Sequence, residues 1–387
     1  MVILLGSLTA MGPLAIDMYL SSLPAIGRSL AVGPAQTQAT VAAFLAGMSI
    51  GQMFYGPASD RFGRRAPVLL GVAIFILASA GCALATSIDQ LLIGRFVQAL
   101  GACAGAVVAR AVVRDRFDHT ETARMLSLMM LIMGLAPILA PLLGAALLTV
   151  GGWRLNFWFM AAFGLAVGGA VVLRLSESRS AATARQAAAE NPFQAYLALM
   201  RARRLVGYAM AGSLNGAALF TYIASAPGLL MGKYGVPVAV FPWLFGLNAV
   251  GIIGGNQVNR FLLRRFTTDQ VLARASVVAL AFGLALTLAA FTGIAGRWSV
   301  LPLLFCVMAS LGFMQGNTMA GALSVDPLRA GSVSALLGAA SFGTGALAST
   351  LAGALHGDPA QSMSLVMMLS LAGSAIFLHA LALPKRA

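Results

Sequence analysis

Long apolar runs, separated by short polar turns, follow one another along almost the whole chain. A helix needs about 20 mainly apolar residues to cross the hydrocarbon core of a bilayer, and most of these runs have that length. The pattern predicts an all-α membrane protein with twelve transmembrane helices, at residues 2–25, 37–57, 67–87, 91–113, 123–149, 155–174, 205–229, 238–261, 270–293, 299–323, 330–355 and 362–383. The first run is too long for the apolar region of a signal peptide, so we interpret it as a span. Its start at residue 2 is compatible with a natural gene start further upstream.

The longest break in the pattern is the segment 175–204, which is rich in alanine, arginine and glutamine. This composition is typical of a surface helix joined to a flexible linker. Because six predicted spans lie on each side, we expect an N-terminal six-helix bundle at 1–174, a cytoplasmic linker at 175–204 and a C-terminal six-helix bundle at 205–387. Two similar halves in tandem are typical of secondary transporters, which bind substrate between the halves near the middle of the membrane.

The composition agrees with this pattern. Apolar residues make up 59% of the chain and charged residues 9%, with a mean hydropathy of +0.89, whereas a soluble protein carries about 25% charged residues. The 43 glycines are expected where membrane helices pack closely. The cysteines lie singly in apolar runs and the histidines (His119, His356 and His379) at or near loops. No metal-ligand spacing results, so we predict no metal site and no cofactor.

The net charge of +14 comes from basic residues that are scattered singly among the predicted loops. On the predicted topology nineteen of them lie on one side of the membrane, four on the other, and two, Arg95 and Arg110, within a span. Because Lys and Arg concentrate in cytoplasmic loops, this asymmetry places both termini in the cytoplasm. Single scattered charges do not make the basic patch that nucleic-acid binding requires, so no nucleic acid is expected as a partner.

The densest charge cluster in the first hundred residues runs from Gly56 to Arg65, between two apolar runs. Each charged group in hydrocarbon costs roughly 2.5–3.5 kcal/mol, so we predict a short loop at the cytoplasmic surface. Gly56 and Gly63 would let the chain turn tightly, and Asp60 would cap the next helix or pair with an arginine. A fainter copy of the cluster lies in the second half, at residues 255–264.

Four stretches of the chain resemble the major facilitator superfamily, and more narrowly its twelve-span drug:proton antiporters of the bicyclomycin, chloramphenicol and florfenicol resistance type. They are Gly56–Arg65, Ile16–Leu20 with Leu23–Pro24, Gly94–Gly101, and Gly134–Pro137 with Ala140–Gly144. Two positions depart from the subfamily pattern, because Ser21 stands in place of a proline and Ala145 in place of a glycine. The resemblance covers nearly the whole chain and implies the superfamily's fold in two six-helix pseudo-repeat halves.

By this resemblance the charged loop clamps the two halves together on the cytoplasmic side, through charge pairs and helix-end dipoles. The residues expected to take part are Gly56, Asp60, Arg61, Gly63, Arg64 and Arg65. The copy in the second half has Asn259 in place of the carboxylate, so it is expected to contribute less. The alternative is a loop that only orients the chain in the membrane.

Asp17 is the only carboxylate that falls within the core of a predicted span. At 1.5 Å per residue it lies about 10 Å below the outer end of its helix and Arg95 about 9 Å below the outer loop, so the two could share one layer. Desolvation raises the pKa of a carboxyl group and a nearby arginine lowers it again, which favours exchange of a proton. We predict that Asp17 and, by resemblance, Arg95 couple transport to protons. The alternatives are a structural ion pair, an aspartate in a water-filled vestibule, and an arginine that reaches towards the outer interface.

Gly134, Pro137, Pro141 and Gly144 recur at spacings of three and four residues along the fifth span, so they lie on one face of that helix. Small residues let neighbouring helices approach, and prolines interrupt the backbone hydrogen bonds. By resemblance these residues form the antiporter motif, which limits proton leak. Ordinary close packing would explain the glycines alone.

The spans offer a substrate an apolar and adaptable interior, with 19 methionines, 21 phenylalanines and few polar groups. The candidate substrate-binding residues are Met18, Tyr19, Asn215, Tyr222, Asn248 and Asn317.

Together these features predict a proton-coupled exporter of small amphipathic or hydrophobic drugs, such as phenicols or bicyclomycin, that works by alternating access in the bacterial inner membrane. The sequence contains no G-x-x-x-x-G-K-[ST] motif, so the energy would come from a gradient.

The nearest alternative is a proton-coupled exporter of an endogenous metabolite, an amino acid derivative or a sugar, which would require a more polar interior. A membrane enzyme would need clustered acids or histidines at membrane depth, and the repeat argues against a channel or receptor. The expected partners are the drug, protons and the lipid bilayer, and two halves in one chain make a monomer sufficient.

Overall fold

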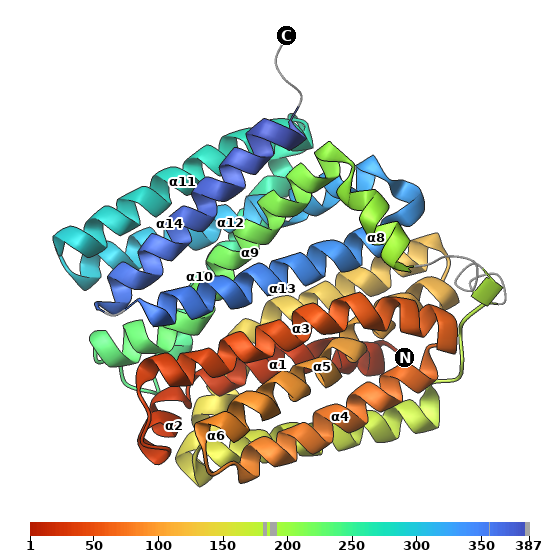
Figure 1. Ribbon diagram of the computed structural model, residues 1–387, viewed down its shortest axis with the longest axis horizontal. Helices are drawn as coiled ribbons and strands as arrows, with labels where there is room; N and C mark the ends of the chain where they lie inside the picture. Colours follow the sequence, from red (N-terminus) through yellow and green to blue (C-terminus); the bar gives the residue numbers. More distant parts are fainter. Residues whose placement is uncertain (181–183, 186–191, 356, 384–387) are drawn as a thin grey trace. The chain divides into compact units, whose positions relative to one another are not determined.

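The computed structural model describes residues 1–180, 184–185, 192–355 and 357–383. Over these residues the chain forms helices and the turns between them, without a strand. It divides into two compact units, Met1–Pro192 (unit 1) and Phe193–Ala387 (unit 2). Within each unit the long helices pack side by side, as Figure 1 shows.

Unit 1 contains six membrane-length helical segments within its described residues. They lie in α1 (Val2–Leu20), α3 (Pro34–Phe62), α4 (Arg65–Leu84), α5 (Ile88–Arg116) and α6 (His119–Arg174), and the short helix α2 (Leu23–Ser29) joins α1 to α3. α6 accounts for two spans because its backbone breaks at Gly151 and Gly152, where φ of Gly152 is +71°. A residue without a Cβ adopts this left-handed conformation readily, so the glycine allows the break.

Unit 2 also contributes six membrane-length segments from its described residues. After the short helix α8 (Pro192–Met200) come α9 (Arg203–Pro227), α10 (Phe241–Leu262), α11 (Thr268–Thr292), α12 (Arg297–Val325), α13 (Ala330–Ala354) and α14 (Pro359–Phe377). Short π-helical turns extend two of them, η1 (Gly228–Lys233) after α9 and η3 (Leu378–Ala382) after α14, and the 3₁₀ turn η2 (Pro327–Arg329) precedes α13.

Over the described residues, these segments make twelve membrane-length helices, which confirms the predicted all-α class and the twelve spans. Within the part of the chain that the structure describes, ten helices are long and apolar enough to cross a membrane by length and hydropathy alone. α6 counts once among the ten although it holds two spans. α10 falls outside them because asparagine, glutamine and arginine near its C-terminal end lower its hydropathy.

Side-chain caps explain where several helices begin. The side chains of Ser87, Asp118, Thr267 and Asp358 each accept a hydrogen bond from a backbone N–H in the first turn of the helix that follows. Such caps satisfy donors that have no partner within the helix. Each capping residue lies in a polar turn between two apolar runs, and for this reason the sequence pattern locates these helix ends well.

Glycines allow the closest approaches between helices. A Cβ on Gly101 of α5 would lie 2.5 Å from the carbonyl oxygen of Gly71 on α4, and a Cβ on Gly312 of α12 would overlap the carbonyl oxygen of Ile252 on α10. Larger residues would force these helix pairs apart.

Two helix ends differ from the prediction. The first span, predicted over 2–25, is interrupted at Ser21 and Ser22, where α1 ends and α2 begins. The second span, predicted to end at 57, continues as helix to Phe62, so the predicted loop is reduced to Gly63 and Arg64. Charge must stay out of hydrocarbon, but a helix can extend beyond the bilayer surface, so the charges did not mark the helix end.

Of the predicted linker 175–204, residues 181–183 and 186–191 lie outside the described residues. α8 forms near its C-terminal end.

Candidate functional site

Asp17 lies in the last turn of α1, in a part of the helix that packs against α5 and α6. Only 4% of its surface is exposed. Its carboxylate has no hydrogen bond or ion pair with any described residue. A carboxylate that is buried without such partners is unusual, because desolvation disfavours its charged form.

Arg95 lies in α5 and has no exposed surface. Its guanidinium lies 4.4 Å from the ring centroid of Tyr19 and 4.3 Å from that of Phe44, and Nη1 donates a hydrogen bond of 2.6 Å to Gln98 Oε1. Nε and Nη2 are buried without a partner among the described residues. Complete burial contradicts the interpretation of Arg95 as an interfacial anchor. Within the described chain it also forms no ion pair with Asp17.

Gln98 connects Arg95 to two further helices. Its Nε2 donates to Ser79 Oγ of α4 at 2.7 Å and lies 3.3 Å from Met160 Sδ of α6. The amide therefore fixes one nitrogen of the guanidinium while its own donor is satisfied by α4 and α6. Sequence reasoning gave Gln98 no role, although it lies three residues after Arg95 and so on the same helix face.

Met18 and Tyr19, both predicted to bind substrate, have no exposed surface. The Tyr19 hydroxyl shares a hydrogen bond of 2.7 Å with Thr40 Oγ1 of α3, and its ring lies 5.4 Å from that of Phe157 on α6. Tyr19 therefore packs within unit 1 and stacks on the Arg95 guanidinium.

The break between α1 and α2 is bonded to both helical parts of α6. Ser21 Oγ donates to the Pro141 carbonyl oxygen at 3.2 Å. Asn156 Nδ2 donates to Ser22 Oγ at 2.7 Å and to the Gly144 carbonyl oxygen at 3.4 Å. Ser21, the departure from the family pattern, thus contributes a hydrogen bond, whereas the role of Asn156 was missed because no local sequence signal points to it.

Pro141 and Gly144 of the predicted antiporter motif lie against this end of α1. A Cβ on Gly144 would overlap the carbonyl oxygen of Met18, the residue after Asp17. Gly134 and Pro137 lie further towards the N-terminus of α6. The motif is thereby in direct contact with the helix turn that carries the buried carboxylate.

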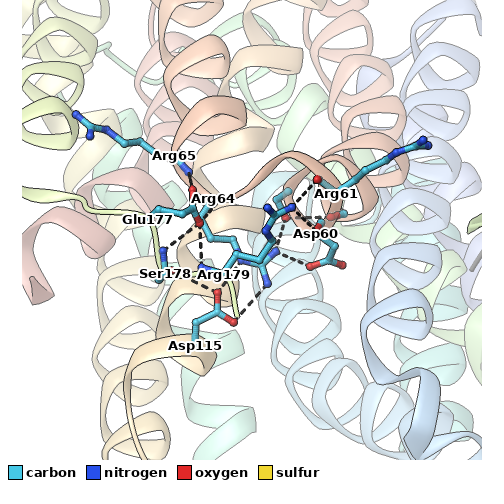
Figure 2. A network of polar contacts seen from close by, with 10 residues as sticks. Asp60, Arg61, Arg64, Arg65, Asp115, Glu177, Ser178 and Arg179 are labelled. Atoms are coloured by element: carbon cyan, nitrogen blue, oxygen red, sulfur yellow. Dashed lines mark hydrogen bonds and ion pairs between the residues drawn. The ribbon is translucent and has the colours of Figure 1, made fainter. Parts of the chain in front are cut away.

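At the α3–α4 junction, the side chain of Arg64 joins two carboxylates (Figure 2). Nη1 lies 2.5 Å from Asp60 Oδ1, and Nε and Nη2 bond the two oxygens of Asp115 on α5 at 2.7 and 3.3 Å. Burial alone lowers the pKa of Arg64, but the hydrogen bonds and charges of Asp115 and Asp60 outweigh burial and raise it. The predicted pairing of Asp60 with an arginine is present, and Asp115 was missed.

Glu177 and Arg179, just beyond α6, complete this network (Figure 2). The Glu177 carboxylate accepts from the backbone N–H groups of Arg64 at 2.9 Å and Arg65 at 3.2 Å, and so caps the start of α4. Arg179 Nη1 donates to the carbonyl oxygens of Asp60 and Arg61 at the end of α3, at 3.2 and 2.5 Å. The first residues of the predicted linker therefore belong to the structure of unit 1.

Four predicted loop residues have different local roles. Gly63 has φ of +94°, and a Cβ there would lie 2.5 Å from Glu177 Oε2. Gly56, in contrast, is helical, so its prediction as a turn residue is wrong. Arg65 donates to the Val172 carbonyl oxygen at 2.8 Å, and the side chain of Arg61 is exposed.

Unit 2 has a neutral pair at the position of the repeated loop. Asn317 Nδ2 donates to Asn259 Oδ1 at 2.9 Å, and Asn259 Nδ2 donates back to Asn317 Oδ1 at 3.3 Å. Among the other predicted substrate residues of this unit, Asn248 donates to the Tyr222 hydroxyl at 3.0 Å, and Asn215 Oδ1 is buried without a partner in the described chain. Tyr222 and Asn248 are therefore the only predicted substrate residues of this unit that bond to each other in the described chain. The side-chain amide of Asn317 instead joins α12 to α10.

The described residues contain no group of three His, Cys, Asp or Glu side chains that could hold a metal ion. His356 lies outside them. His379 Nε2 shares a hydrogen bond of 3.1 Å with Ser276 Oγ.

A family model described as Major Facilitator Superfamily matches residues 5–350. The chain belongs to this superfamily. It is therefore a multi-pass membrane transporter and not an enzyme.

Several relatives match this superfamily member over most of their length. The "Uncharacterized MFS-type transporter YdgK" of Bacillus subtilis is 35% identical over 90% of this chain and 87% of its own. The "Bicyclomycin resistance protein homolog" of Haemophilus influenzae is 29% identical over 90% and 88%, and the "Multidrug resistance protein MdtL" of Klebsiella pneumoniae 33% identical over 86% and 83%. Among solved structures, a D-xylose-proton symporter has the same fold, with a TM-score of 0.73 and 13% identity over 97% of each chain.

The Glu177 cap generates a prediction about pH. Burial raises the pKa of Glu177, but the backbone N–H groups of Arg64, Arg179, Arg65 and Ser178 together lower it below its usual range. A carboxylate with a lowered folded-state pKa stabilises the fold above its unfolded pKa, and this contribution is lost as the pH falls through the folded pKa. We expect Glu177→Gln to lower the free energy of unfolding by about 1 kcal/mol at neutral pH, and to have little effect below the lowered pKa.

Thermal unfolding in detergent at neutral and acidic pH measures this difference. Glu121→Gln, at the start of α6 and outside the network, is the control. A deficit of Glu177→Gln that persists unchanged in acid would contradict the capping role.

Proposed function

We propose that this transporter is a drug:proton antiporter that exports small amphipathic or hydrophobic drugs across the bacterial inner membrane by alternating access. The printed names of two relatives, a bicyclomycin resistance homologue and a multidrug resistance protein, support drug efflux. The observation that carries the proton coupling is Asp17, a carboxylate buried in α1 with no partner in the described chain. The topology proposed is the one predicted from charge, with both termini cytoplasmic.

In this mechanism Asp17 alternates between two states. As an anion it is uncompensated in an apolar environment, which favours either a proton or a cationic group as its partner. Protonation from the outside neutralises it, and loss of the proton towards the cytoplasm restores the charge. Arg95, the buried cation of the same unit, is proposed to take part in this coupling, without an ion pair to Asp17 in the described chain.

Residues at the α3–α4 junction would serve a different step. Arg64, Asp60, Asp115 and Glu177 form a bonded network at the end of unit 1. We propose that this network, as part of a bundle at 1–174, clamps the cytoplasmic side when the transporter faces outward, with the bundle at 205–387 as its counterpart and 175–204 as the linker. The neutral Asn259–Asn317 pair would contribute less to that clamp.

The substrate is proposed to contact the predicted residues Met18, Tyr19, Asn215, Tyr222, Asn248 and Asn317 only where transport exposes them. Asn215 and Asn248 are the strongest candidates among them, because the buried Oδ1 of each lacks a partner in the described chain. Met18 and Tyr19 are the weakest, because both are fully buried.

The first prediction of this proposal concerns Asp17→Asn. We expect this variant to reach the membrane normally and to lose drug-induced proton movement by more than tenfold, because an amide cannot carry the proton. Proton release from everted vesicles that hold a pH gradient, upon addition of phenicols and hydrophobic cations, measures the coupling. Asp89→Asn, at the exposed start of α5, is the matched control.

Drug-induced proton flux that survives in Asp17→Asn would refute the assignment of the carboxylate. If no drug causes proton release from wild-type vesicles, the result would instead favour the exporter of an endogenous metabolite.

The second prediction concerns Arg95. Lysine keeps the charge but loses the planar group that stacks on Tyr19 and Phe44 and bonds Gln98. We expect Arg95→Lys to reduce coupled transport about tenfold and Arg95→Ala to abolish it. The same vesicle assay, with protein amount checked by blotting, separates the two. Full coupling in Arg95→Ala would show that the buried charge is not needed.

The third prediction concerns the antiporter motif. We expect Gly144→Leu to increase passive proton leak severalfold in drug-free proteoliposomes, because the new side chain pushes α6 away from Met18. Gly169→Leu is a matched control in the same helix, since a Cβ there meets no atom within 4 Å. Equal leak from the two variants would count against a sealing role.

A further inference from the structure

Unit 2 carries a groove that is separate from every residue discussed as a transport site. Its volume is about 320 Å³. Apolar side chains of two neighbouring helices line its length, Val271, Val278 and Phe282 from α11 and Phe305, Ala309 and Phe313 from α12. Leu262, at the end of α10, and Phe266, in the turn that follows, also border it.

One charged side chain, Arg274, belongs to the lining. Its guanidinium lies 4.5 Å from the ring centroid of Phe266 and makes no hydrogen bond or ion pair with any residue that the structure describes. The other polar residue of the lining, Ser310, donates to the Val307 carbonyl oxygen at 2.6 Å and is thereby satisfied. The groove therefore offers a ligand one cation and an apolar channel.

The surroundings of Arg274 carry an excess of positive charge. Arg260, Arg264 and Arg265 lie at the same end of unit 2, in or just before the turn between α10 and α11. Asp269 is the one carboxylate of that stretch, and it is occupied, because it accepts from Tyr208 at 2.5 Å and pairs with Arg204 at 3.5 Å. No described carboxylate is left to compensate Arg274.

Arg274 lies six residues after the start of α11, about 9 Å along the helix axis. The groove continues from there to Phe282, about 12 Å further into the span. The Arg274 side chain is exposed, and lipid phosphates supply anions for such a cation at the boundary between headgroups and chains.

We propose that the groove binds one anionic phospholipid. Its phosphate lies on the Arg274 guanidinium, and one acyl chain fills the apolar channel between α11 and α12. The charge selects an anionic headgroup, and the apolar walls select a hydrocarbon chain. A cationic amphipathic drug is disfavoured at this position because four arginines repel it.

Native mass spectrometry of the full-length protein in detergent tests the proposal, with dioleoyl phosphatidylglycerol and dioleoyl phosphatidylcholine as probes of equal chain length. We expect the wild type to retain one phosphatidylglycerol in preference to phosphatidylcholine, and Arg274→Gln to weaken that binding about tenfold, the loss of a charge-assisted hydrogen bond. Arg274→Lys keeps the charge and should retain most of the preference. Ala309→Phe fills the channel and should reduce binding of both lipids.

Arg297→Gln is the matched control. Arg297 stacks on Trp298 at 5.1 Å, at the opposite end of α12, and does not line the groove. Equal retention of the two lipids by the wild type, or equal losses in Arg274→Gln and Arg297→Gln, would overturn the proposal. Displacement of the lipid by a transported phenicol would also overturn it, since the groove would then be a drug site.

Discussion

Arg95 keeps a positive charge inside unit 1, where no described carboxylate pairs with it. Even after relaxation, burying an ion costs several kcal/mol. The compensation is spread over the rings of Tyr19 and Phe44 and the amide of Gln98. These partners come from α1, α3 and α5, so the buried charge is tolerated only while three helices pack around it. A cation held in this way also stabilises the arrangement of the helices that hold it.

The same packing leaves two buried polar side chains, Arg95 and Asp17, with groups that have no hydrogen-bond partner in the described chain. On Arg95 these are the two nitrogens Nε and Nη2, and on Asp17 the carboxylate. Both lie beside the break between α1 and α2, which Ser21 and Asn156 bond to α6. Any movement of this end of α1 relative to α6 has to break those hydrogen bonds. Buried polar groups without a partner are uncommon in folded proteins, and this end of α1 combines such groups with a helix break that is held by hydrogen bonds.

Much of this arrangement could be predicted from the sequence, for reasons that differ from residue to residue. Apolar runs locate the helices because hydrocarbon tolerates no other regular structure within one segment. The pairing of Asp60 with Arg64 was accessible because four residues along a helix bring side chains together. Asp115, Glu177 and Asn156 were not, because their partners lie 51, 113 and 134 residues away. Only the packed fold brings such residues together.

The two units hold their corresponding helix junctions together with different side chains. At the α3–α4 junction, unit 1 uses an arginine between two carboxylates, with Glu177 capping the next helix. At the related position, unit 2 uses two asparagines that bond each other. A pair of amides cannot titrate, and salt screens it little, whereas carboxylates and their ion pairs respond to both. Of these two junctions, therefore, the one in unit 1 is the one that responds to pH and ionic strength through its carboxylates.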